Sequence, residues 1–318
     1  MHIFLSLVIP CYNEEDVLDL FYSEIIDVLN RENYRYELIF VNDGSKDTTM
    51  GKIKKYATSN ECVKYISFSR NFGKESAMLA GLKYAKGEHV GILDADLQHP
   101  PDAIPAMLRA ITDEGFDIAA ARRVNRSGET RLKSMFSRIF YKVINRLADV
   151  NIKEGAQDFR IMKNKVVQSI ISMPEYHRFS KGIFSWVGFN TKWFEHHNVE
   201  RLLGESKWNF TSLIKYAVNG IISFSIVPLR LALFIGVIVS LVGFVQIFYI
   251  LIDFLFFTNR EDVRTGFASI MSAIFLVGGT ILICVGIIGE YVSRIYIEVK
   301  NRPSYIINET NMEVDLHD

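Results

Sequence analysis

Acidic and amide side chains gather in the stretch His89–Pro101. A short apolar run, Val90–Leu93, reads as a buried strand and stops at Asp94; Asp96 and Gln98 then follow at two-residue spacing. Carboxylates at the end of a strand can turn toward one point, and hard oxygen ligands suit Mg²⁺ or Mn²⁺. A solvated acidic turn is the alternative. The position at the end of a strand favours the metal site.

Composition and charge narrow the class of protein. A chain of 318 residues has room for one sizeable domain and something more. Its formal net charge is zero, so no basic field indicates a nucleic-acid partner. Three scattered cysteines argue against a disulfide framework or a zinc site. The first residues lack the pattern of a signal peptide, so we expect the N-terminal part to stay in the cytosol.

The first part of the chain alternates between apolar runs and amphipathic segments. We expect a helix capped by Asn13 and ending near Leu29, and a sharp turn at Gly44. Strands that alternate with helices predict a mostly parallel sheet with helices on both faces. The expected strands cover residues 5–10, 36–41, 63–68, 90–93 and 117–121.

Polar residues follow the first four expected strands. In an open parallel sheet, ligands bind at the carboxyl ends of the strands, where the strand order reverses. Each polar loop alone could be ordinary turn chemistry, but four at one edge predict a nucleotide pocket. The chain has no G-x-x-x-x-G-K-[ST] and no G-x-G-x-x-G after the first strand, which argues against a P-loop or dinucleotide fold. The residues in question are Tyr12, Asn13, Glu14, Asp43, Arg70, Lys74, Asp94 and Asp96.

The motifs in these loops resemble the inverting family 2 glycosyltransferases, which have the Rossmann-like GT-A fold. Within that family the closest branch is the polyprenyl-phosphate glycosyltransferases, which includes dolichyl-phosphate mannose synthases and bactoprenol glucosyltransferases. The motifs are Val8–Glu14, Val41–Ser45, Asn71–Lys74 and Asp94–Gln98. The resemblance implies that the metal is held by Asp94, Asp96 and Gln98. It also implies that the nucleotide sugar is bound by Pro10, Tyr12, Asn13, Glu14, Asp43, Lys74 and Asp94.

Two basic segments are candidates for binding the phosphate of a second substrate. Arg122, Arg126 and Arg131 lie in a loop that the resembled branch uses as an acceptor loop, and the guanidinium fork matches phosphate oxygens. Arg201 and Lys207 lie in a later segment that resembles the branch's Arg-x-x-Gly-x-Ser-Lys loop. Solvated or mutually paired charges are the alternative for both segments.

Glu154–Arg160 resembles the branch's Asp-Phe-Arg segment, whose aspartate is assigned as the catalytic base. The resemblance implies a catalytic role for Asp158, together with Asp96. A lipid phosphate is already largely ionised near neutrality, because its second pKa is about 6, so Asp158 can instead orient the acceptor. A cap for a helix from about Lys163 is the structural alternative. We interpret His196 as a surface histidine, because no other metal ligand is nearby in the sequence.

Two uncharged stretches, residues 231–252 and 265–289, have the length needed to cross a membrane; buried core helices are the alternative. Arg230 and the basic residues after the second stretch place both ends in the cytosol. Segments 130–150 and 209–225 are expected to form amphipathic helices at the lipid interface. We therefore expect a cytosolic GT-A domain over 1–225, two transmembrane helices within 226–292, and a cytosolic tail over 293–318.

These observations predict an integral protein of the cytoplasmic membrane that transfers one sugar from a nucleotide sugar to polyprenyl phosphate. The resemblance implies UDP-glucose and undecaprenyl phosphate as the substrates, with mannose, galactose, N-acetylglucosamine or an aminoarabinose left open as the sugar; Mg²⁺ or Mn²⁺ is the expected cofactor. Alternatives are transfer from GDP-mannose, a processive polysaccharide synthase, and a non-catalytic nucleotide-sugar sensor or scaffold. A processive synthase would carry a Gln-x-x-Arg-Trp motif and more spans, which this chain lacks. Expected partners are a second copy of the chain, a separate flippase and a later glycosyltransferase for cell-envelope glycans.

Overall fold

The structure is a computed structural model, and it describes residues 3–123, 145–146, 150, 152–173, 175–196, 222–256 and 266–313. The chain divides into two compact units. One unit combines residues 1–223 with residues 302–318, and the other consists of residues 224–301. The segments expected at the lipid interface, 130–150 and 209–225, lie almost wholly outside the described residues.

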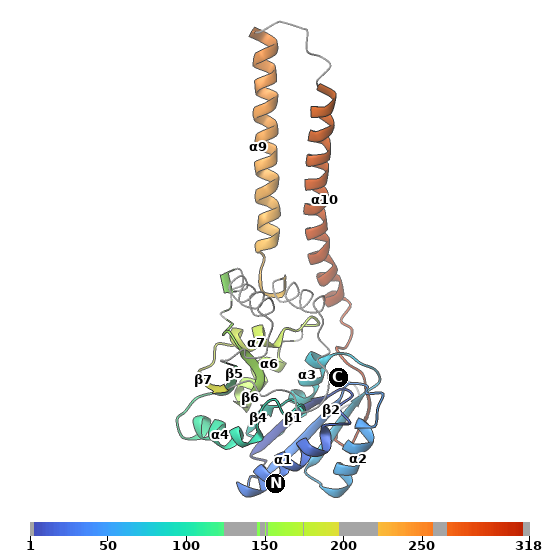
Figure 1. Cartoon of the computed structure of the whole chain (residues 1–318), viewed down its shortest axis with the longest axis vertical. Coiled ribbons are helices and arrows are strands. Elements are labelled where there is room, and N and C mark those ends of the chain that lie inside the picture. The colour runs from blue at the N-terminus through green and yellow to red at the C-terminus, as the bar shows by residue number, and fades with distance from the viewer. Residues whose placement is uncertain are drawn as a thin grey trace. The chain divides into compact units, whose positions relative to one another are not determined.

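The first unit is built on an eight-stranded sheet of order β7-β5-β6-β4-β1-β2-β3-β8 (Figure 1). The neighbours β3-β2-β1-β4 are all parallel, and so are β5 and β7. β6 runs antiparallel between β4 and β5, and β8 runs antiparallel to β3. The mostly parallel α/β sheet expected for a GT-A domain is therefore confirmed. The strands are β1 Leu5–Cys11, β2 Tyr36–Asn42, β3 Val63–Phe68, β4 His89–Ile92, β5 Ile118–Arg123, β6 Ala156–Lys163, β7 Thr191–His196 and β8 Ile307–Thr310.

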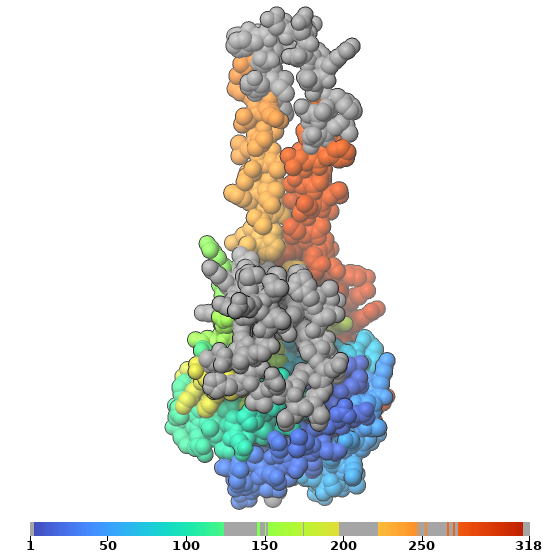
Figure 2. All heavy atoms as spheres, in the orientation of Figure 1, coloured from blue at the N-terminus to red at the C-terminus, as the bar shows by residue number. Residues whose placement is uncertain are grey.

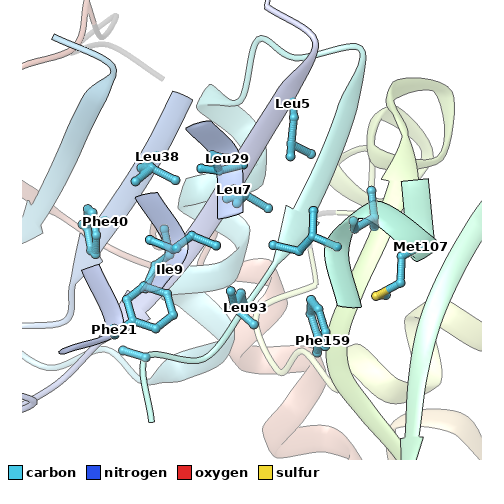
Figure 3. Close-up of a cluster of buried hydrophobic side chains, with 14 of the residues drawn as sticks. Leu5, Leu7, Ile9, Phe21, Leu29, Leu38, Phe40, Leu93, Met107 and Phe159 are labelled. Atoms are coloured by element: carbon cyan, nitrogen blue, oxygen red, sulfur yellow. The ribbon is translucent and has the colours of Figure 1, made fainter. Parts of the chain in front are cut away.

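The helices pack with their apolar faces against the sheet, which removes those faces from water. Gly81 of α3 fits against β1 so closely that a Cβ there would lie 2.1 Å from Cγ1 of Val8. Figure 3 shows part of the core, with Ile9 of β1 near Phe21 of α1 and Leu93. The helices are α1 Leu18–Arg31, α2 Thr49–Ser59, α3 Lys74–Tyr84, η1 Pro101–Ala103, α4 Ile104–Thr112, α6 Asn164–Ile171 and α7 Ser180–Trp186.

The expected helix cap at Asn13 is wrong, because α1 begins only at Leu18. Asn13 has a φ of 53°, a left-handed conformation that asparagine tolerates better than most residues. Its side-chain Oδ1 accepts a hydrogen bond from the backbone N–H of Lys46 at 2.8 Å, and its own N–H donates to Oγ of Ser45 at 3.0 Å. Asn13 thus connects the loops after β1 and β2.

Residues 302–318 belong to the first unit, and within them β8 pairs with the edge of β3. The two strands are joined by side chains as well as by the backbone. Asn311 accepts a hydrogen bond from the N–H of Tyr65 at 2.8 Å and donates to the carbonyl of Val63 at 3.1 Å. Lys54 and Glu309 form an ion pair at 2.7 Å. The segment expected as a tail therefore contributes a strand of the first unit.

The second unit contains α9, Val227–Phe256, and α10, Gly266–Val299, which pack against each other. At 1.5 Å per residue these helices are about 45 Å and 51 Å long, more than the ~30 Å of membrane hydrocarbon. By length and composition both could cross a membrane. Figure 2 shows α9 and α10 side by side. Large apolar side chains along them are exposed, such as Phe275 at 72% and Leu282 at 74%. Such exposure is unlike that of the buried core helices considered as the alternative.

Candidate active site

The strand order reverses between β1 and β4, so the loops that follow these strands diverge to opposite sides at this point. Because β1, β2, β3 and β4 are parallel, their carboxyl ends meet at one edge of the sheet. This is the edge at which open α/β sheets bind ligands. The sheet order therefore brings the polar loops of the first four strands to a single site.

Asp43, which follows β2, is buried and holds the loop after β3. Its two carboxylate oxygens accept hydrogen bonds from the backbone N–H groups of Phe72, at 2.6 Å, and Gly73, at 2.9 Å. Burial raises the pKa of Asp43, and the two N–H bonds oppose that shift. Gly44 packs against the same loop: its φ is 65°, and a Cβ there would lie 2.4 Å from the backbone carbon of Arg70. Asp43 thus fixes the backbone that leads into Lys74.

The residues at the end of β1 and just after it lie at the same edge of the sheet. Pro10 lies within β1 opposite Val41 of β2, and it is partly exposed. Tyr12 and Glu14 are also partly exposed, and the backbone N–H of Glu14 donates to Oγ1 of Thr49 at 2.9 Å. Their role in nucleoside binding stays a prediction.

Asp94 and Asp158 are brought face to face by the antiparallel pairing of β4 with β6. Ile92 lies opposite Arg160, and continuing this register by two residues sets Asp94 opposite Asp158. The ammonium of Lys74 lies between them. Its Nζ is 2.7 Å from Oδ1 and 2.9 Å from Oδ2 of Asp94, and 2.6 Å from Oδ2 of Asp158. Three residues from distant parts of the chain thus form one ion-pair cluster.

The Asp158 carboxylate remains ionised in this setting. Burial by itself raises the pKa of Asp158, but the cations of Lys74 and Lys181 outweigh it and hold the pKa well below its ordinary range. Asp158 lies within β6, so the helix-cap alternative is wrong. Asp158 is therefore a fixed negative charge, suited to orienting groups and to stabilising nearby positive charge.

Arg160 and Glu75 lie next to this cluster, and neither is among the site residues predicted from the sequence. The buried guanidinium of Arg160 lies 3.5 Å from the ring centroid of Phe184 and donates to the carbonyls of Gln157, at 2.6 Å, and Asp158, at 3.2 Å. Burial lowers the pKa of Arg160 to about 10, so the group stays protonated. Residues two apart share one face of a strand, and this spacing from Asp158 is the signal that could have identified Arg160.

Glu75 connects α3 to α7. Its carboxylate accepts hydrogen bonds from the hydroxyl of Ser180 and from the backbone N–H of Ser180, at 3.1 Å and 3.2 Å. Burial, and then the charge of Asp158, raise the pKa of Glu75 to about 7. Glu75 thus anchors the start of α7, the helix that supplies Phe184 and Lys181 to the surroundings of Asp158.

Asp94, Asp96 and Gln98 offer the oxygen ligands of a hard cation. Oδ1 of Asp96 accepts a hydrogen bond from the N–H of Gln98 at 3.1 Å, around a left-handed Leu97 with φ of 54°. Within the described residues, no group of three His, Cys, Asp or Glu side chains could hold a metal by itself. Mg²⁺ is usually bound by one or two carboxylates together with substrate phosphates, so these residues fit an ion shared with a diphosphate.

The structure describes one of the five residues predicted to bind the acceptor phosphate. Arg122, the last residue but one of β5, forms a 3.0 Å ion pair with the exposed Glu195 of β7. Four other candidates, Arg126, Arg131, Arg201 and Lys207, lie outside the described residues.

His196, expected at the surface, is partly exposed and lies against a second histidine. Its Nε2 lies 2.7 Å from Nδ1 of His99, a buried residue stacked on Phe159, and His196 itself is half-buried. Burial lowers the pKa of His99 to about 4. His196 is the last residue of β7, which pairs with β5, and no local sequence pattern specifies that pairing.

The chain matches two known protein families and several curated relatives. Residues 6–171 match the family "Glycosyl transferase family 2", and residues 227–295 match "GtrB C-terminal hairpin". The chain is 42% identical to the putative glycosyltransferase CsbB of Bacillus subtilis, over 97% of this chain and 92% of that protein. It is also 42% identical to the SfII prophage-derived bactoprenol glucosyl transferase of Shigella flexneri, over 96% and 98%.

One similar solved structure is glucosyl-3-phosphoglycerate synthase from Mycobacterium tuberculosis, in complex with Mn²⁺, UDP-glucose and phosphoglyceric acid. It has a TM-score of 0.47 and 17% identity, and the match covers 69% of this chain and 78% of that one. Family assignment rests on the sequence matches, which cover more than half of the chain by family and nearly all of it by relatives. This chain is a member of glycosyltransferase family 2.

Proposed function

We propose that this enzyme transfers one glucose from UDP-glucose to undecaprenyl phosphate, with inversion at the anomeric carbon. The cluster of Asp94, Lys74 and Asp158 at the reversal point of the sheet supports this proposal, because it would bring a diphosphate and an acceptor phosphate to one charged site. The choice of glucose and of a polyprenyl phosphate is supported by the relatives named bactoprenol glucosyl transferase.

The donor is proposed to bind across the carboxyl ends of β1, β2 and β4. Pro10, Tyr12, Asn13 and Glu14 would contact the nucleoside, and Asp43 would support it while holding the backbone before Lys74. Asp94, Asp96 and Gln98 would hold Mg²⁺ or Mn²⁺ on the diphosphate. When bound, the ion neutralises the charge that builds up on the leaving UDP.

The acceptor phosphate is proposed to approach from the side of Asp158. An oxygen of the lipid phosphate forms a bond to the anomeric carbon as the bond to UDP breaks, and the electron pair of that bond leaves with UDP. The lipid phosphate is already largely ionised, so it has little need of a base. Asp158 would orient the reactants and stabilise positive charge that develops on the sugar, while Arg122 and the other basic candidates would bind the phosphate.

The membrane hairpin is proposed to keep this site near the lipid headgroups. The first unit contains chain segments from both before and after α9 and α10, so the chain has to leave and re-enter that unit on one side of the membrane. Arg230, Arg294 and Arg302 flank the apolar segments and favour the cytosolic side. A second copy of the chain, a flippase and a later transferase are the proposed partners.

A product assay tests this function. Purified full-length protein in detergent would be incubated with undecaprenyl phosphate, Mg²⁺ or Mn²⁺, and UDP-glucose, UDP-galactose, UDP-N-acetylglucosamine or GDP-mannose. Mass spectrometry should find one lipid product that carries a single hexose from UDP-glucose. EDTA and Asp96→Asn should abolish it, while Asp102→Asn, which alters an exposed ion pair with Arg31, should not. A product from GDP-mannose alone would move the assignment to mannose, and nucleotide binding without any lipid product would refute the transferase.

A further inference from the structure

The ammonium of Lys74 is paired with Asp94, the carboxylate that the proposed metal needs as a ligand. Both oxygens of Asp94 lie within hydrogen-bond distance of Nζ, at 2.7 Å and 2.9 Å. The same Nζ lies 2.6 Å from Asp158, so among the described residues the ammonium pairs with these two acidic side chains. In this arrangement a divalent ion and this ammonium cannot both bind the carboxylate oxygens of Asp94.

Lys74 places a positive charge where the proposed metal would bind. Partial burial lowers the pKa of Lys74, but the charges of Asp158 and Asp94 outweigh it and hold the pKa above its ordinary value, so the group remains a cation. An ammonium next to a bound divalent ion would repel it, because both are positive and close together. Only added negative charge, such as that of a diphosphate, can hold both cations in one place.

The backbone of Lys74 is fixed, but its side chain has room to move. The N–H of Gly73, the preceding residue, is held by Asp43, and Glu75, the following residue, is held by Ser180. The Lys74 side chain is 42% exposed, more than Asp94 at 24% or Asp158 at 18%. A flexible four-carbon stem can therefore move the ammonium from Asp94 to a phosphate oxygen while its Cα stays in position.

We infer that Lys74 is a built-in counter-cation that competes with the divalent ion for Asp94, so that metal binds tightly only together with a nucleoside diphosphate. The inference rests on the proposed function, because it assumes that Asp94 is a ligand of the metal. It adds an order to the binding steps: the diphosphate draws Lys74 away from Asp94 and admits the metal. It also gives Lys74 two partners in turn, a carboxylate first and a phosphate afterwards.

Mn²⁺ binding tests the inference without any turnover. The full-length protein in detergent would be titrated with Mn²⁺, with and without UDP, and free Mn²⁺ followed by electron paramagnetic resonance. We expect weak Mn²⁺ binding by the wild type alone and at least tenfold tighter binding with UDP. Lys74→Met should tighten the binding of Mn²⁺ alone at least tenfold and reduce the gain from UDP. Lys74→Arg, which keeps the charge, should resemble the wild type.

Lys83→Met is the matched control, because it removes an exposed lysine from the same helix. It should leave Mn²⁺ binding unchanged. Lys74→Gln is a second neutral variant, and circular dichroism and UDP binding check that the variants fold. If UDP tightens Mn²⁺ binding in the wild type but Lys74→Met and Lys74→Gln bind Mn²⁺ alone no better, the inference is wrong and the metal proposal stands. If no protein binds Mn²⁺ even with UDP, both fail.

Discussion

Replacing Glu75 by glutamine should make the first unit more stable at neutral and alkaline pH. In the folded protein, burial and then the charge of Asp158 raise the pKa of Glu75 from 4.5 to about 7. A carboxyl with a raised pKa holds its proton more tightly when folded, so the free energy of unfolding falls as the pH rises. The loss begins near pH 4.5 and is complete above about pH 7. At about 1.36 kcal/mol per pKa unit it amounts to about 3 kcal/mol.

Glutamine resembles the protonated form and can still accept a hydrogen bond from the N–H of Ser180. Glu75→Gln should therefore match the wild type near pH 4.5 and exceed it by up to about 3 kcal/mol at pH 8. For a domain of this size, each kcal/mol corresponds to roughly 2–4 °C in melting temperature.

Tryptophan fluorescence during heating measures the unfolding of the unit that contains Glu75. The three tryptophans, Trp186, Trp193 and Trp208, all belong to the first unit. Glu114→Gln is the control, because Glu114 is an exposed glutamate paired with Lys192. If Glu75→Gln lowers the melting temperature at pH 8, or leaves its dependence on pH unchanged, the assigned cost of the ionised Glu75 is wrong.

Three further outcomes follow from the geometry. Asp158→Asn should lower kcat about 100-fold while UDP binding by calorimetry is retained, since the lost charge acts on the reaction rather than on the nucleotide; an unchanged kcat would exclude that role. Gly44→Ala should lower the free energy of unfolding by about 1–3 kcal/mol in thermal melts, because its φ is 65° and a Cβ would meet Arg70; an unchanged melting temperature would contradict the close approach. Deleting residues 303–318 should expose the edge of β3 and increase aggregation measured by light scattering; a monodisperse, equally stable product would show that β8 is dispensable.

The order of strands and helices in the first 120 residues could be predicted because its strands are apolar on both faces. β1 and β2 are buried almost throughout, and such runs are typical of central parallel strands. Since parallel strands end at one edge, the grouping of Asp43, Lys74 and Asp94 also followed from the sequence. The confirmed family resemblance depended on these same loops.

The contacts that complete the site could not be predicted, because they depend on pairing between distant segments. The facing of Asp94 and Asp158 follows from the register of β4 with the antiparallel β6, which no local pattern encodes. Asn13 has the chemistry of a helix cap, yet its side chain bonds to the next loop instead. β8 has one apolar residue among its four, and its partners in β3 lie 239 to 244 positions earlier in the chain.

The placement of β8 has a consequence for how the enzyme is made. The ribosome synthesises α9 and α10 before β8, so the edge of β3 stays without its final partner until both helices have been made. The last step in assembling the sheet is thus coupled to the completion of the hairpin. If α9 and α10 cross the membrane as proposed, a chain whose hairpin inserts in the wrong orientation would keep β8 apart from β3 and leave an open sheet edge.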